Sequence, residues 1–302
     1  MPALEIGVVL PLIQYGADRT TTRWTEIRQM AVRAEEIGFD TIWTPDELVW
    51  RSENGPPIGV WDGISMAGAV AAVTKRGKVG TWVLSALHRN AGIIAKTAET
   101  LDEISGGRFV FGLGAGHEWP GQAKAFGLPE DKIFARFEEA LRIIVPLIRD
   151  GHADFEGTFH AARDLPQSPR GPRPGKMPLL IGGNGPKGQR HAVRHADIWS
   201  AYVEERAHVD EVGPRIKSLE AICAEESRDP ASIGRSIGAY VNPLLPAGAK
   251  PNLISGSARE IADTVLSFRD AGYTQVELMP SIGKPEAVEA LGPVVELVKA
   301  AD

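Results

Sequence analysis

The sequence predicts a (β/α)8 barrel, and two observations support this prediction. Apolar runs typical of buried strands alternate with helical stripes eight times along the 302 residues, and no change in composition marks a second domain. Eight strand–helix units in about 300 residues match the count and length of such a barrel. A doubly wound open sheet is the alternative. We expect one domain over residues 1–302, with an insertion at 151–177 before the fifth strand.

The predicted strands are short apolar runs rich in residues that suit a buried sheet. They cover residues 4–10, 41–44, 78–84, 108–113, 179–181, 197–201, 236–241 and 274–279.

A predicted helix follows each strand, with apolar residues three or four positions apart on one face. The first helix carries its stripe at Trp24, Ile27, Ala31 and Ala34, and the second covers residues 61–73. The later stripes are Ile94, Ala98 and Leu101, then Ile133, Phe137, Leu141 and Ile144, then Val209, Val212, Ile216 and Leu219.

Three local signals refine these helices and the insertion. Pro146 is expected to kink the fourth helix, and Ser257 and Glu260 have the spacing of a capping box. Residues 154–163 suggest a hairpin around Gly157. The basic residues of the crossover that follows are expected to be solvated rather than to form an anion site: Arg170, Arg173 and Lys176.

Composition and charge limit the function classes. Lys and Arg number 33 against 39 Asp and Glu, so the formal net charge of −6 gives no general attraction for nucleic acid or anionic membranes. Cys223 is the only cysteine, which excludes an internal disulfide and favours a reducing cytoplasm. The first residues, MPALEIGVVLP, resemble a strand rather than a signal peptide, and no apolar run approaches the roughly 20 residues of a membrane span. We therefore expect a cytoplasmic protein whose partner is a small-molecule substrate.

Residues 178–199 have the pattern of a strand, a phosphate loop and a helix. Gly182, Gly183 and Gly185 allow close backbone approach, and Pro186 suits the first helical position. Free N–H groups at the helix start, together with the Lys187 ammonium, would hold a phosphate. An ordinary glycine-rich turn is the alternative.

The ends of the other strands carry the polar residues that a barrel uses for chemistry. They include Asp46 and Glu47 after the second strand, and Ser85, His88, Arg89 and Asn90 after the third. A flat aromatic ring system could be held at this rim by the tryptophans near these ends: Trp43, Trp50, Trp61, Trp82 and Trp119.

Three segments resemble the luciferase-like family of flavin- and deazaflavin-dependent oxidoreductases. They are GFDTIWTPDEL at 38–48, TAETLDEISGGRFVFGLGAGHEW at 97–119, and the GGNGPK loop followed by RHADIW. The three occur in the order and at the spacing of that family, whose members fold as (β/α)8 barrels with an insertion before strand five.

The resemblance implies a cofactor, F420 or alternatively FMN, with its ring in the barrel mouth. Its phosphate would lie on Gly182, Gly183, Asn184, Gly185, Pro186 and Lys187, and Gly114, Ala115 and Gly116 would approach its ribityl chain or ring. F420-using relatives often carry a bulge with a non-prolyl cis peptide in strand three, which corresponds here to residues 80–83, with Thr81–Trp82 as the expected bond. Asp46 would orient loops or bind the cofactor head, and relatives are often homodimers.

One departure bears on the substrate. The sugar-phosphate dehydrogenase branch carries a His at the position of Glu47 and a Glu at the position of His117, so the two are exchanged here. Either residue could be the proton carrier, and His117 is the first choice because histidine titrates near neutrality. The substrate of that branch is therefore not expected for this chain.

The predicted function is hydride transfer between F420 and a small organic substrate. An FMN-dependent monooxygenase and a non-catalytic flavin-binding relative are the alternatives. A Schiff-base enzyme would need a lysine at a strand end, which none of the predicted strands has. His191 and His195 lack the Glu of a zinc-binding HExxH helix, so no metal site is predicted.

Overall fold

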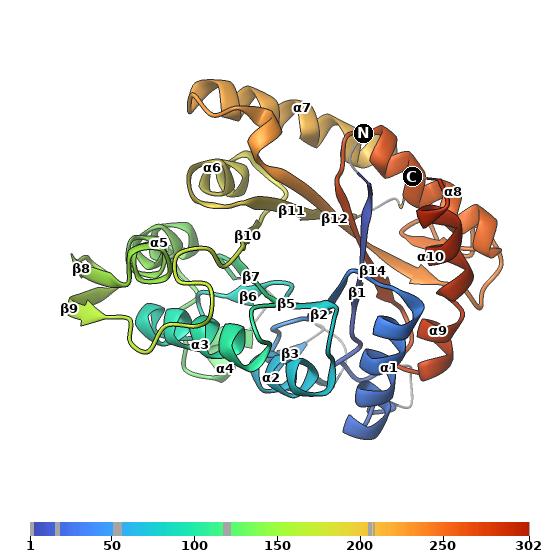
Figure 1. Cartoon of the computed structure of the whole chain (residues 1–302), viewed down its shortest axis with the longest axis horizontal. Coiled ribbons are helices and arrows are strands. Elements are labelled where there is room, and N and C mark those ends of the chain that lie inside the picture. The colour runs from blue at the N-terminus through green and yellow to red at the C-terminus, as the bar shows by residue number, and fades with distance from the viewer. Residues whose placement is uncertain are drawn as a thin grey trace.

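The computed structural model describes residues 3–15, 19–50, 56–116, 122–204, 207 and 209–301. Within them, eight parallel strands pair in a closed ring, and β10 bonds to β7 to complete it (Figure 1). The predicted barrel is therefore confirmed. In ring order the strands are β1 (Glu5–Val9), β2 (Thr41–Thr44), β5 (Lys78–Thr81), β7 (Phe109–Gly114), β10 (Leu179–Gly182), β11 (Ile198–Tyr202), β12 (Gly234–Asn242) and β14 (Gln275–Pro280).

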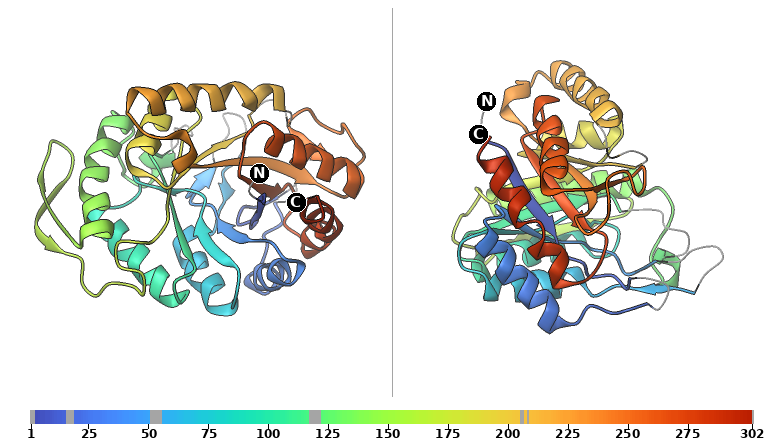
Figure 2. Two further views of the ribbon diagram at one scale, coloured as in Figure 1. Left: turned by 45° about the horizontal axis from the view of Figure 1, so that its top comes forward. Right: turned by 90° about the vertical axis from the view of Figure 1, so that its right-hand side faces the viewer.

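Helices surround this ring on the outside (Figure 2) and bury their apolar stripes against it. They are α1 (Trp24–Ile37), α2 (Gly63–Val73), α3 (Ala91–Ile104), α5 (Ile133–Asp150), α6 (Pro186–His195), α7 (Val209–Glu225), α8 (Ala258–Asp270) and α10 (Gly292–Lys299). No described helix is long and apolar enough to cross a membrane.

Smaller elements lie between these units. They are the ribbon of β3 (Val49–Trp50) and β4 (Ile58–Gly59), strands β6 (Leu84–Ser85) and β13 (Leu253–Ser255), helices α4 (Gln122–Ala125) and α9 (Pro285–Glu289), and a 3-10 turn at Pro230–Ser232.

The helix boundaries follow local chemistry. The capping box of Ser257 and Glu260 is confirmed at the start of α8. Helix α2 starts two residues later than expected, because the carboxylate of Asp62 accepts a hydrogen bond of 2.7 Å from the Ser65 N–H and caps the helix there. Helix α5 continues through Pro146 to Asp150.

The insertion before β10 contains the expected hairpin. Strands β8 (His152–Glu156) and β9 (Ala161–Pro166) pair antiparallel and extend away from the ring (Figure 1). The prediction that the basic crossover is solvated was wrong for two residues. Arg170 pairs with the buried Glu99 at 2.8 Å, and Arg173 pairs with the buried Asp102, so both arginines fasten the crossover to α3. Buried carboxylates need such partners.

The third predicted strand is interrupted by a bulge. Gly80 is opposite Val110 and Leu84 is opposite Leu113, so a step of four residues on one strand faces a step of three on β7. The bulge was expected at 80–83. The non-prolyl cis peptide is Trp82–Val83, one bond later than the Thr81–Trp82 bond expected.

Two indoles and a carboxyl group occupy the inside of the barrel. Trp43 was expected at the rim, but it is fully buried inside the barrel. Its Nε1 donates to Glu277 Oε2 at 2.5 Å, and a Cβ on Gly7 would lie 1.9 Å from that oxygen. The indole of Trp82 likewise packs against Gly238, where a Cβ would lie 2.2 Å from the ring. Inward-facing glycines therefore make room for both rings.

A chain of hydrogen bonds joins these groups. Trp82 Nε1 donates to Ser200 Oγ at 2.9 Å, Ser200 Oγ lies 3.2 Å from Ser236 Oγ, and Ser236 Oγ lies 3.1 Å from Glu277 Oε1. Burial raises the pKa of Glu277 to about 8, although the hydrogen bonds from Trp43 and Ser236 oppose the rise. A neutral carboxyl group is therefore favoured inside the barrel.

We expect this carboxyl group to make wild-type stability depend on pH. Between about pH 5 and 8 the unfolded chain has released this proton and the folded chain has not, so stability falls as pH rises, by at most about 1.4 kcal/mol per pH unit. Glu277→Gln should remove this slope, so its Tm relative to wild type should rise from pH 5 to pH 7.5 in calorimetric scans. Glu286→Gln, which removes an exposed carboxylate of α9, is the control. Parallel Tm profiles for wild type and Glu277→Gln would contradict a neutral Glu277.

Candidate functional site

A pocket opens at the carboxyl ends of four neighbouring strands, β12, β14, β1 and β2. Its volume is about 880 Å³, counting its open mouth. Apolar side chains form much of its lining, among them Val9, Leu12, Ile58, Val60 and Met279, and Glu47, Tyr15 and Tyr240 bring polar groups. Val9 and Met279 also belong to the apolar cluster that includes Trp82 and Val83, so one cluster connects the pocket to the bulge. Such a pocket is the usual place for a ligand in this architecture.

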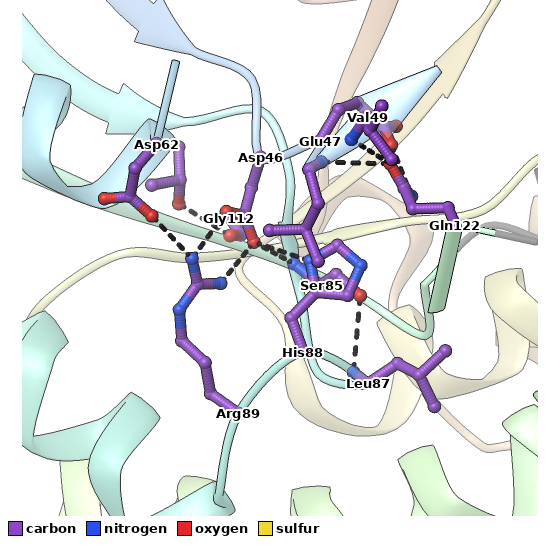
Figure 3. A network of polar contacts seen from close by, with 12 residues as sticks. Asp46, Glu47, Val49, Asp62, Ser85, Leu87, His88, Arg89, Gly112 and Gln122 are labelled. Carbon is purple, nitrogen blue, oxygen red and sulfur yellow. Dashed lines mark hydrogen bonds and ion pairs between the residues drawn. The ribbon is translucent and has the colours of Figure 1, made fainter. Parts of the chain in front are cut away.

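Asp46, the residue before Glu47, is the centre of a buried polar network (Figure 3). Its carboxylate accepts a hydrogen bond from the Ser85 N–H at 2.9 Å and two from the Arg89 guanidinium at 2.6 and 2.9 Å. Arg89 also donates to Asp62 at 3.1 Å, and His88 Nδ1 lies 3.6 Å from Asp46. These contacts tie the loop after β2 to β6 and to the start of α2.

The network keeps Asp46 ionised. Burial alone would raise the pKa of Asp46, but the contacts with His88 and Arg89 outweigh burial and lower the pKa below its ordinary value. Asp46 is not among the described residues that line the pocket. Its contacts fit the loop-orienting role predicted for it, and the alternative role in cofactor binding stays a prediction.

Glu47 lines the pocket, and its carboxyl group accepts a hydrogen bond from Gln122. Gln122 Nε2 donates to Glu47 Oε2 at 2.9 Å, while Gln122 Oε1 accepts hydrogen bonds of 2.9 Å from the N–H groups of Leu48 and Val49 (Figure 3). Burial raises the pKa of Glu47, against the opposing effect of the Gln122 hydrogen bond. A carboxyl group with a raised pKa can exchange a proton nearer neutral pH.

Some residues of this site were missed by sequence reasoning. Gln122 follows the GAGHEW motif in a region without periodicity, and Tyr15 and Tyr240 come from opposite ends of the chain. Glu47 and Tyr240 both line the pocket, and burial together with the charge of Glu47 raises the pKa of Tyr240. No sequence signal joins these residues, since the closed ring alone places β14 between β12 and β1 and so brings the two ends of the chain together.

The predicted residues of the GAG turn lie at the end of β7, close to the bulge. The Thr81 hydroxyl donates to the Gly112 carbonyl at 2.7 Å. A Cβ on Gly114 would lie 2.8 Å from Val83, and Gly116 has a φ of +103°, which disfavours other residues. Ala115 is half-buried between them. His117, with Glu118 and Trp119, lies outside the described residues.

The predicted phosphate loop follows β10 as expected. A Cβ on Gly182 would lie 3.1 Å from Val83, so this loop and the GAG turn contact the same side chain. Gly183 packs on Gly188, where a Cβ would lie 2.8 Å from the Gly188 Cα. The amide of Asn184 is used within the fold, because its Oδ1 accepts from the Tyr202 N–H at 2.9 Å and its Nδ2 donates to Glu204.

The start of α6 is open to solvent. Gly185 is the N-cap residue, Pro186 takes the first helical position, and no side chain caps the helix. A Cβ on Gly185 would meet no atom within 4 Å. The ammonium of Lys187 lies 5.5 Å from the centre of the Phe134 ring. The uncapped N–H groups and the positive end of the helix dipole make this loop suitable for a phosphate.

The described residues do not suggest a metal site. Among them, no group of three or more His, Cys, Asp or Glu side chains is placed to hold a metal ion. His191 packs edge-on against Phe137, with ring centres 5.3 Å apart, and burial lowers the pKa of His191 and of His195.

Comparison with known proteins agrees with this geometry. The chain is similar to F420-dependent glucose-6-phosphate dehydrogenase from Amycolatopsis mediterranei, with 30% identity over 228 residues, 71% of this chain. The match spans 62% of that enzyme's own length. Among solved structures, an F420-dependent secondary alcohol dehydrogenase in complex with an F420-acetone adduct superimposes with a TM-score of 0.81 at 20% identity, covering 98% of this chain and 99% of that one.

A monooxygenase from Streptomyces bottropensis has the same fold, with a TM-score of 0.77, 18% identity and 98% of each chain covered. The family model described as luciferase-like monooxygenase matches residues 4–243. This match includes seven of the eight ring strands and all the predicted site residues. The chain therefore belongs to the luciferase-like monooxygenase family.

Proposed function

We propose that this protein is an oxidoreductase that transfers a hydride between coenzyme F420 and a small organic substrate. One observation carries the proposal. The half-buried carboxyl group of Glu47 lines the pocket, one apolar cluster connects the pocket to Trp82 and Val83 of the bulge, and Val83 lies against both glycine turns. A substrate in the pocket would thus lie beside the residues that we assign to the cofactor.

The residues around the bulge fit such a cofactor. Gly182 and Gly183 would let the backbone approach its phosphate, and the N–H groups at the start of α6 would bind it, with Lys187 adding a positive charge. Gly114, Ala115 and Gly116 would line its ribityl chain or ring, and Thr81 and Trp82 would support the ring. The amide of Asn184 would stabilise the loop conformation, because its Oδ1 accepts a hydrogen bond from the Tyr202 N–H of β11.

F420, when bound, supplies a ring carbon that accepts a hydride from the substrate or returns one. The protein's part is to position the substrate, exclude water and move a proton. Glu47 is suited to the proton step, because its carboxyl group reaches the pocket and burial raises its pKa. His117 is the other candidate for this role.

F420 is favoured over FMN by the similarity to F420-dependent glucose-6-phosphate dehydrogenase. The family also includes monooxygenases, so FMN-dependent oxygenation is the second candidate. Titrating the protein with F420 and with FMN, while following cofactor fluorescence, distinguishes the two. We expect saturable binding of F420. Tight FMN binding without an F420 response would favour the monooxygenase, and a tightly bound cofactor with no turnover would favour a non-catalytic flavin-binding protein.

The phosphate loop gives a specific prediction for cofactor affinity. Gly185→Asp should weaken F420 binding at least about tenfold, equivalent to about 1.4 kcal/mol, because a carboxylate there would occupy the helix start and repel a phosphate. The site has room for the side chain, so the variant should fold and Tm should not fall. Gly185→Ala, which adds no charge, is the matched control and should bind nearly as wild type. Equal affinities for all three proteins would show that the phosphate loop is misassigned.

The role of Glu47 can be tested through pH dependence. In the direction of substrate oxidation the base must be unprotonated, so wild-type kcat/KM should rise with pH through the raised pKa of Glu47. Glu47→Gln should lower kcat by roughly 100- to 10,000-fold and abolish this rise, while F420 affinity stays within a factor of three or so of wild type. If the variant keeps the same pH profile, another residue carries the proton.

A further inference from the structure

We infer that the pocket takes an uncharged alcohol or carbonyl compound with a largely apolar body, and that it discriminates against phosphorylated substrates. This inference rests on the proposed function for the reaction. The evidence for the substrate class comes from the lining of the pocket itself.

The first line of evidence is the distribution of charge. Among the described residues that line the pocket, none is Lys, Arg or His, and the charged side chain is the acidic Glu47. Val9, Leu12, Ile58, Val60 and Met279 provide apolar surface from β1, the β3–β4 ribbon and β14. A phosphate monoester carries a charge of about −1.5 to −2 at neutral pH. Among these described lining residues such a charge would find no cation to pair with it, and burying an unpaired charge is strongly unfavourable.

The second line of evidence is the electrostatic potential. Burial raises the pKa of Tyr240, which lines the pocket, and the negative charge of Glu47 raises it further. At Tyr202, burial and the charges of Glu204 and Glu47 raise the pKa, whereas the charge of Arg215 lowers it. Because Glu47 lines the pocket, its carboxylate, when ionised, would repel an anionic substrate there.

The third line of evidence is that nearby polar groups are already in use. Arg89, the cation of the adjoining network, donates to Asp46 and Asp62. The amide of Gln14 accepts from the Gly59 N–H at 2.7 Å and donates to Thr21 at 3.0 Å. The pocket therefore offers an extended apolar surface with a few polar groups, Glu47 among them. A single hydroxyl or carbonyl group on an apolar body matches that arrangement.

A secondary alcohol satisfies the chemistry of the proposed reaction. Its carbinol C–H bond breaks, and both electrons leave with the hydrogen as a hydride that reduces oxidised F420. Its O–H proton passes to the carboxylate of Glu47, the C–O bond becomes a carbonyl, and a ketone is released. In the opposite direction reduced F420 is oxidised, and Glu47 returns the proton to the oxygen.

The test compares substrates that differ in charge. With the full chain saturated with F420, kcat/KM should be at least 100-fold higher for 1-phenylethanol than for glucose 6-phosphate. Equal or faster turnover of glucose 6-phosphate would overturn the inference. So would a clear preference for an organic amine of the same size over the alcohol.

A binding measurement separates this inference from the proposed function. Ligand-observed NMR without cofactor should show acetophenone binding at least tenfold more tightly than 4-acetylphenyl phosphate. If F420 does not bind but acetophenone is still preferred over its phosphate analogue, the proposed function is contradicted and the inferred substrate class is supported. If F420 binds but neither ketone is preferred, the inferred substrate class is contradicted and the proposed function is supported.

A charge placed in the lining provides a matched pair of variants. Ile58→Lys puts an ammonium group on the β3–β4 ribbon, outside the barrel interior, and should tighten binding of 4-acetylphenyl phosphate at least tenfold. Ile58→Gln adds polarity without charge and should not. No change in the Lys variant would contradict an electrostatic basis for the selection.

Discussion

The site depends on one buried ion pair, between the Asp46 carboxylate and the Arg89 guanidinium. Asp46 follows β2, Arg89 precedes α3, and Asp62, which shares the guanidinium, caps α2. Removing one partner of a buried pair typically costs about 3–5 kcal/mol, because the other charge is left without compensation. Glu47 is the next residue after Asp46, so the position of its carboxyl group in the pocket follows from this pair and from the Gln122 hydrogen bonds.

The bulge after β5 is the second constraint. The extra residue places Val83 against Gly114 of β7 and Gly182 of β10, where an added Cβ would lie 2.8 and 3.1 Å from the Val83 side chain. On the inner side, Trp82 joins the hydrogen-bond chain that ends at Glu277. The position of the bulge residues between the pocket and the two glycine turns therefore depends on packing across three neighbouring strands, and not on one loop alone.

The strands and helices of the barrel could be predicted because their periodicity and caps are local. The fold class, the hairpin, the capping box and the bulge at 80–83 are confirmed. Trp43 was wrongly expected at the rim because alternation does not tell which face of a strand points inward. The contacts of Gln122 and Glu277 join residues 75 and 234 positions apart, which no local pattern encodes. The cofactor contacts, the single-domain organisation, a homodimer and a cytoplasmic location stay predictions.

The ring of strands divides into two arcs. The pocket is lined from β12, β14, β1 and β2, which are consecutive in the ring, whereas the bulge, the GAG turn and the glycine loop belong to β5, β7 and β10, which are also consecutive. The two arcs are joined by the hydrogen-bond chain from Trp82 through Ser200 and Ser236 to Glu277, and by the apolar cluster that includes Val9, Met279 and Trp82. The lining of the pocket and the two glycine turns therefore come from different strands of one ring, and a substitution in one lining lies on a different strand from the other.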